Sequence, residues 1–101
     1  IIKKSGLIDY FKKELHYPEA IILFGSFAKA ENDEKSDIDL FIITNTKKKL
    51  NMQKYEKIFQ RELQIFMHSP EEFIKLQKEN KHLVNNVLNG IILHGFVEVF
   101  K

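Results

Sequence analysis

Two short apolar runs, separated by a polar stretch, limit what this chain can fold into. Ala20–Phe24 is a continuous apolar run that Gly25 ends, and a second run lies within Asp37–Thr44. Both are shorter than an ordinary helix and rich in β-branched and aromatic residues, so each predicts a strand. The first is typical of a strand buried on both faces. In the second, alternation places Ile38, Leu40 and Ile42 on one face and Asp37, Asp39, Phe41 and Ile43 on the other.

Helical patterns alternate with these strands. The apolar spacing predicts a helix over Ser5–His16 that stops before Pro18, and Ser69-Pro70-Glu71-Glu72 predicts a second start, with Ser as the cap and acids in the first turn. Further helices are expected over Ser26–Ala30, Lys49–Phe59 and Lys81–Leu88, and further strands over Leu63–His68, Ile91–His94 and Phe96–Phe100, the last at a sheet edge. The alternation predicts an α/β or α+β fold with helices packed on a sheet.

Composition narrows the class of protein. A length of 101 residues suits one domain, which we place at residues 1–101. The formal net charge of +2 does not indicate nucleic-acid binding, and the absence of Cys excludes disulfides and thiol catalysis. No apolar stretch approaches the roughly 20 residues that span a bilayer, so we expect a cytoplasmic protein without a membrane partner.

The basic run Lys47-Lys48-Lys49 predicts a solvated loop and helix start, or alternatively an edge that attracts polyphosphate or an acidic partner.

Gly25 and Ser26 form a plausible phosphate site. Glycine after a buried strand lets the backbone turn sharply and lets a ligand approach closely. The free amides at the start of the following helix favour an anion, and the Ser26 hydroxyl adds a hydrogen-bonding group.

Asp37 and Asp39 are the candidate metal ligands. They are two residues apart on the expected strand, so both project from one face. Asp39 lies inside an apolar run, where an unpaired carboxylate is costly. Magnesium prefers hard oxygen ligands and typically takes one or two carboxylates plus substrate phosphates. Each motif alone has a structural interpretation, as a turn or strand end, but their order and spacing together favour a site.

The order Gly25-Ser26, short helix, loop and Ser36-Asp37-Ile38-Asp39-Leu40 resembles the DNA polymerase β-like nucleotidyltransferase superfamily. The length and the Ser69–Phe73 segment are similar to its minimal nucleotidyltransferase (MNT) members, which often pair with small helical proteins of the HEPN type. The resemblance runs from Ala20 to Gly95. It implies a mixed β-sheet covered by helices. Lys29 stands where the family often has Arg, and Ala30 where it often has Gly.

The resemblance also implies an activity and roles. The activity is transfer of a nucleoside monophosphate, most plausibly AMP from ATP, to a hydroxyl acceptor, in the setting of an antitoxin that modifies a HEPN partner. Gly25 and Ser26 would hold the β- and γ-phosphates, Lys29 would neutralise phosphate charge, and Asp37 and Asp39 would hold magnesium.

The third expected strand departs from the family pattern. Five residues before the capping Ser69, where members carry a third carboxylate that assists the acceptor hydroxyl, this chain has Gln64. Gln can orient a hydroxyl but cannot accept its proton. Glu62 is two residues before Gln64 and on the same strand face, about 6.6 Å away from it.

Two further interpretations stay open. Gln64 favours a module of the same fold that binds a nucleotide or partner without turnover, whereas Asp37 and Asp39 favour an enzyme; a purely structural subunit would leave both aspartates incidental. The histidines, of which His68 is the best placed, lack metal-ligand spacing, and the tyrosines Tyr10, Tyr17 and Tyr55 are expected to pack.

Overall fold

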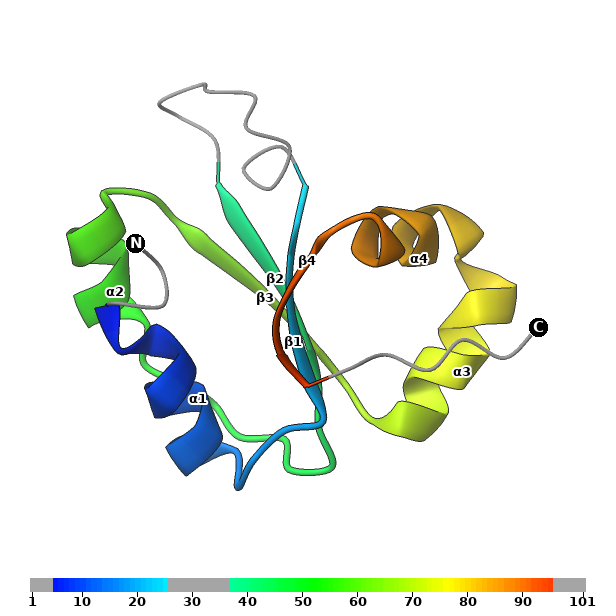
Figure 1. Ribbon diagram of the computed structural model, residues 1–101, viewed down its shortest axis with the longest axis horizontal. Coiled ribbons are helices and arrows are strands. Elements are labelled where there is room, and N and C mark those ends of the chain that lie inside the picture. Colours follow the sequence, from blue (N-terminus) through cyan, green and yellow to red (C-terminus); the bar gives the residue numbers. More distant parts are fainter. Residues whose placement is uncertain (1–4, 26–36, 96–101) are drawn as a thin grey trace.

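The structure, a computed structural model, describes residues 5–25 and 37–95. In chain order its elements are α1 (Leu7–Glu14), β1 (Ala20–Phe24), β2 (Ile38–Ile43), α2 (Gln53–Phe59), β3 (Leu63–His68), α3 (Pro70–Glu79), α4 (Lys81–Leu88) and β4 (Ile91–Gly95), as Figure 1 shows. None of the described helices could span a bilayer; α3, for example, has 10 residues.

The four described strands form one mixed sheet in the order β3-β2-β1-β4. β1 pairs antiparallel with both β2 and β4, whereas β2 and β3 are parallel. β1 therefore ends at the side of the sheet where the other three strands begin. We call this side the upper end, because it lies uppermost in Figure 1.

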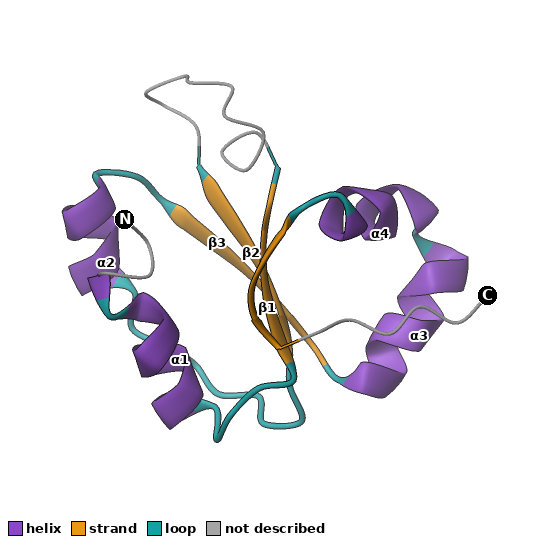
Figure 2. Cartoon of the chain, in the orientation of Figure 1, coloured by secondary structure: helices purple, strands orange, loops and turns teal. Residues whose placement is uncertain are grey.

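Helices cover both faces of the sheet. α1 and α2 lie on one face, and α3 and α4 lie on the other (Figure 2). The alternating side chains of β1 supply both cores, with Ile21 and Leu23 facing α1 and α2, and Ile22 and Phe24 facing α3 and α4. β2 divides in the same way, which explains why these two strands are apolar at almost every position.

The observed architecture confirms the expected fold class, a mixed sheet with helices packed on it. The bounds of β1, β3 and α4 agree with those expected from the sequence. At each end, β2 is one residue shorter than expected and α1 is two residues shorter. The helix expected over residues 26–30, the loop over 31–36 and the strand over 96–100 lie outside the described residues.

The prediction that a helix begins at Lys49 is wrong. Residues 45–52 form a loop, and α2 begins only at Gln53, whose amide donates to the Asn51 side chain at 3.1 Å. The preceding lysines are used elsewhere. Lys47 forms an ion pair with Glu72 of α3, and Lys48 forms one with Glu14 of α1. The loop thus contacts helices on both faces of the sheet.

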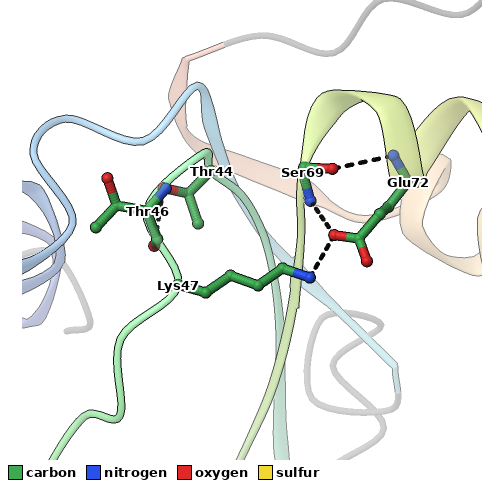
Figure 3. Close-up of polar contacts among 5 residues, drawn as sticks. All are labelled: Thr44, Thr46, Lys47, Ser69 and Glu72. Carbon is green, nitrogen blue, oxygen red and sulfur yellow. Dashed lines mark hydrogen bonds and ion pairs between the residues drawn. The ribbon is translucent and has the colours of Figure 1, made fainter.

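The start of α3 is a capping box (Figure 3). The Ser69 hydroxyl accepts a hydrogen bond from the Glu72 amide at 3.1 Å, and the Glu72 carboxylate accepts one from the Ser69 amide at 2.8 Å. The same carboxylate pairs with Lys47. These donors stabilise the charged form, Lys47 most of all, and lower the pKa of Glu72 to about 2.

This lowered pKa predicts a pH-dependent contribution to folding. A carboxyl group that is more acidic in the folded chain stabilises it above the unfolded pKa, and the stabilisation is lost as pH falls through the folded value. We expect Glu72→Gln, which keeps the amide contact but removes the charge, to lower the free energy of unfolding at pH 7. The difference from wild type should vanish between pH 4.5 and about 2. Urea titrations across that range would measure it.

Glu71→Gln is the matched control, since Glu71 is the neighbouring acid in the same helical turn and is exposed. It should show a smaller difference at pH 7. Equal effects of the two variants at every pH would mean that the general charge of the first turn, rather than the capping box and Lys47, sets the stability of this helix.

Candidate functional site

Gly25 and Asp39 meet at the upper end of the sheet. Phe24, the last residue of β1, is opposite Asp39 of β2 in the antiparallel register, so Gly25 follows directly beside the aspartate. Gly25 has a φ of 80°, a left-handed conformation that favours glycine. A Cβ at this position would lie 2.3 Å from Oδ2 of Asp39. The missing side chain of Gly25 is therefore what leaves room for the carboxylate.

Asp37 and Asp39 form a pair of like charges. Asp37 immediately precedes β2, Asp39 is the second residue of the strand, and both are partly buried. The pKa of Asp39 is raised above its ordinary value, first by burial, which disfavours the charged form, and second by the nearby charge of Asp37. In the described part of the chain, the ion pairs of Lys47, Lys48 and Lys75 involve neither aspartate.

This pair suits a divalent cation. A cation would offset both causes of the raised pKa, the burial and the neighbouring negative charge. In the described ranges no group of three or more His, Asp or Glu side chains has a metal-binding arrangement. Magnesium commonly combines one or two carboxylates with oxygens of the substrate and of water, and the Asp37 and Asp39 pair would supply the carboxylates.

Gln64 lies beside both aspartates. In the parallel register of β2 and β3 it is directly opposite Asp39, and its Nε2 lies 3.5 Å from Oδ2 of Asp37, a long hydrogen bond. The position at which the sequence suggested a missing third carboxylate is thus adjacent to the pair. Glu62 lies just before β3, where its carbonyl accepts a hydrogen bond from the Ile38 amide at 2.9 Å.

Other residues considered from the sequence are distributed differently. Ser26 and Lys29 lie outside the described residues. His68 ends β3 at the opposite end of the sheet from the aspartates, stacked on Phe41, and burial is the main cause of its lowered pKa. Of the tyrosines, Tyr55 is buried, as expected, whereas Tyr17 is 76% exposed, which corrects its expected packing.

A hollow that no sequence pattern predicted lies next to the aspartate pair. Asp37 also lines an open hollow of about 900 Å³, whose other described lining residues come from α2 and the turn into β3: Gln53, Glu56, Lys57, Gln60, Arg61 and Glu62. The turn depends on Gln60, which has a left-handed φ of 55° although it is not glycine. Glycine or asparagine usually marks such a turn, so a glutamine at this position does not predict it.

Comparison with known proteins agrees with this geometry. The family model described as Polymerase beta, Nucleotidyltransferase matches residues 5–95, which include every described strand and helix. Searches among curated proteins and among solved structures each returned no match. A match over most of the chain, together with a mixed sheet that brings Gly25, Asp37 and Asp39 to one end, identifies the chain as a member of the polymerase β nucleotidyltransferase family, a class of nucleotidyl-transferring enzymes.

Proposed function

We propose that this chain transfers AMP from ATP to a hydroxyl acceptor with the help of magnesium. The observation that carries the proposal is the contact between Gly25 and Asp39 at the upper end of the sheet, with Asp37 beside them. A glycine turn offers close approach to a polyphosphate, and the two carboxylates offer hard oxygen ligands within the same few ångströms. Family membership supports nucleotidyl transfer as the general reaction.

Each site residue would have its own role in the reaction. Gly25, with Ser26 and the amides that follow it, would hold the β- and γ-phosphates, and Lys29 would neutralise their charge. Asp37 and Asp39 would hold magnesium, which supplies charge neutralisation at the α-phosphate and at the leaving group. The acceptor oxygen would bond to the α-phosphorus as the bond to the bridging oxygen breaks. Pyrophosphate would leave with that electron pair, and the acceptor proton would pass to water or to a base.

Gln64 favours a second candidate function, a module that binds nucleotide or partner with little turnover. Its amide reaches Asp37 and its backbone pairs with Asp39, so it occupies the place from which a carboxylate would assist the acceptor. An amide cannot take up the proton. Since Asp37 and Asp39 are intact, we expect ATP and magnesium to bind in either case.

We further propose a small helical partner of the HEPN type, which the chain would modify as an antitoxin. The support is family membership, together with the resemblance of the Ser69–Phe73 segment to the minimal members of the family. Expressed with its neighbouring genes, the chain should co-purify with such a protein. Recovery of the chain alone under those conditions would contradict the partnership.

Two substitutions test the site itself. Asp39→Asn should abolish the magnesium dependence of ATP binding, because it removes one charged ligand. Gly25→Ala should weaken magnesium-dependent ATP binding by about tenfold, because its Cβ would displace the Asp39 carboxylate from its place. Isothermal titration calorimetry with and without magnesium would measure both.

Gly6→Ala is the control for Gly25→Ala. Gly6 has a comparable φ of 87°, but a Cβ there would meet nothing within 4 Å. It should therefore lose similar stability from backbone strain and leave ATP binding intact. If wild type bound ATP equally well with and without magnesium, the metal role of the aspartates would be rejected.

Gln64→Asp tests whether the third acid is missing. General-base assistance typically contributes about 10²–10⁴-fold, so wild type should bind ATP and magnesium normally yet transfer slowly, and Gln64→Asp should raise the transfer rate. Incorporation of label from α-labelled ATP into a HEPN-type acceptor would measure it. Glu62→Ala is the companion variant, since Glu62 is the alternative acid near this strand. Fast transfer by wild type that Gln64→Asp slows would show that Gln64 is not a degraded base.

A further inference from the structure

The side chains of the site lie on one face of the sheet, the face that α3 and α4 cover (Figure 2). Asp39 is two residues from Phe41, which packs in the core under these helices, and Gln64 is two residues from Phe66, which packs against the same core. β3, which carries Gln64, is an edge strand of the described sheet. Across this face the order is therefore Gly25 after β1, the aspartates on β2, Gln64 on β3, and then the side of β3 that faces away from β2, which we call the outer edge.

The backbone groups of β3 divide between β2 and the outer edge. The carbonyls of Glu62 and His68 each accept a hydrogen bond of 2.9 Å from an amide at or just beyond an end of β2. Since the backbone groups of a strand alternate in direction, the even-numbered residues between them also bond to β2. The amides and carbonyls of Ile65 and Met67 therefore point outward. In residues 5–25 and 37–95 no hydrogen bond reaches these outward groups.

Glu56 of α2 marks where this unpaired edge begins. Its carboxylate accepts a hydrogen bond at 3.0 Å from the amide of Leu63, the first outward amide of β3. The next outward groups are the carbonyl of Leu63 and the amide of Ile65, which lie on either side of Gln64. An extended segment that bonds to both groups in a parallel arrangement has one residue directly opposite Gln64. The side chain of that residue lies on the face of the aspartates.

β3 also lacks the features that usually block pairing at a sheet edge. Charged residues, proline and bulges are common protections. The segment Leu63–His68 has no Lys, Arg, Asp, Glu or Pro, and its pairing with β2 is regular over all six residues. The other edge strand, β4, differs, because its pairing with β1 has a register shift between Ile21 and Ile22. The regular, uncharged edge of β3 therefore suits a partner strand.

We propose that the outer edge of β3 binds an extended, hydroxyl-bearing segment of a polypeptide acceptor by strand addition. The inference rests on the proposed function and adds the acceptor side to it. In an in-line displacement the attacking oxygen and the leaving group lie on opposite sides of the phosphorus. With the leaving phosphates at the Gly25 turn and the α-phosphate at Asp37 and Asp39, the attacking hydroxyl comes from the β3 side of the same face.

The spacing of strands agrees with this placement. Neighbouring strands lie about 4.8 Å apart, so the Cα of a residue opposite Gln64 is about 10 Å from that of Asp39, two strand spacings away. The α-phosphate and the acceptor side chain both fit within that separation. A Tyr, Ser or Thr at this position of the added strand thus projects toward the aspartates from beside Gln64.

The outer edge selects a polypeptide because of the groups that it presents. Amides and carbonyls repeat along it, and another peptide backbone offers donors and acceptors at the same repeat. Main-chain bonding provides the affinity. The part-exposed side chains of Phe66 and His68, further along β3, meet every second side chain of the added segment.

Amide exchange measured by NMR tests the edge without requiring turnover. In the free chain the amides of Ile65 and Met67 should exchange rapidly, whereas those of Gln64 and Phe66, which bond to β2, should be protected. A seven-residue peptide of alternating Thr and Val with a central Tyr would be titrated in, with magnesium and α,β-methylene-ATP, which cannot release pyrophosphate. Exchange of the Ile65 and Met67 amides should then slow by about tenfold as the peptide approaches saturation.

N-methylated peptides provide the first control, on the wild-type chain. Only alternate amides of an added strand face β3. Methylation of one alternate set of peptide amides should therefore abolish binding, and methylation of the other set should leave it intact.

Ile65→Pro tests the same edge from the protein side. It removes the outward amide but keeps the bonds to β2, because proline is tolerated on an edge strand when its nitrogen faces away from the sheet. Ile65→Val is the matched control, since it keeps that amide. Calorimetry should show wild-type magnesium-ATP affinity in both variants, and only Ile65→Pro should lose peptide binding. If Ile65→Pro does not fold, the methylated peptides decide the question.

Several results would contradict strand addition. Intact magnesium-ATP binding combined with unchanged exchange of the Ile65 and Met67 amides, or with equal binding of the two methylated peptides, would overturn this inference alone. Binding of an oligoribonucleotide with a free 3′ hydroxyl in place of the peptide would do the same. Absence of magnesium-dependent ATP binding in wild type would overturn the proposed function as well.

Discussion

The antiparallel pairing of β1 with β2 is the interaction on which the rest of the structure depends. Both strands are buried almost throughout, and their alternating side chains form the cores on both faces of the sheet. Their register also sets the site, because pairing Phe24 with Asp39 brings the glycine turn against the carboxylate. A slip of one residue would turn the apolar side chains of β2 to the opposite faces and separate Gly25 from Asp39. Core packing and site geometry thus enforce the same alignment.

Burying a carboxylate next to these paired strands is unfavourable in free energy, and the placement of the two aspartates limits that penalty. Asp37 immediately precedes β2 and Asp39 is its second residue, so both lie at the rim of the sheet rather than at its middle. Both remain partly exposed, and the polar amide of Gln64 faces them from β3. Further along the same strand, where burial is complete, every side chain is apolar until Thr44. The site therefore occupies the part of the sheet where solvent and ligands can still reach charged groups.

Much of this arrangement could be predicted from sequence, for identifiable physical reasons. The strands were predictable because their apolar periodicity reflects burial directly, and α3 because its capping box is local in sequence. The start of α2 was not, because Met52 provides no side-chain cap and Lys47 and Lys48 pair with residues distant in sequence. Asp37 and Asp39 could be proposed from their spacing on a strand, and Gln64 from the resemblance to the family. The hollow could not, since it depends on a left-handed Gln60 and on the placement of α2 beside β2.

The strand order affects how the chain folds while it is being synthesised. β4 is the last described strand in sequence, yet it pairs with β1, which lies near the beginning. While a ribosome is still synthesising residues 26–90, one edge of the Ala20–Phe24 strand has no partner from β4. An apolar strand with an open edge is prone to pair with other nascent chains. Until residues 91–95 emerge, the strand that later organises both cores and the site is the segment of the chain most exposed to misassembly.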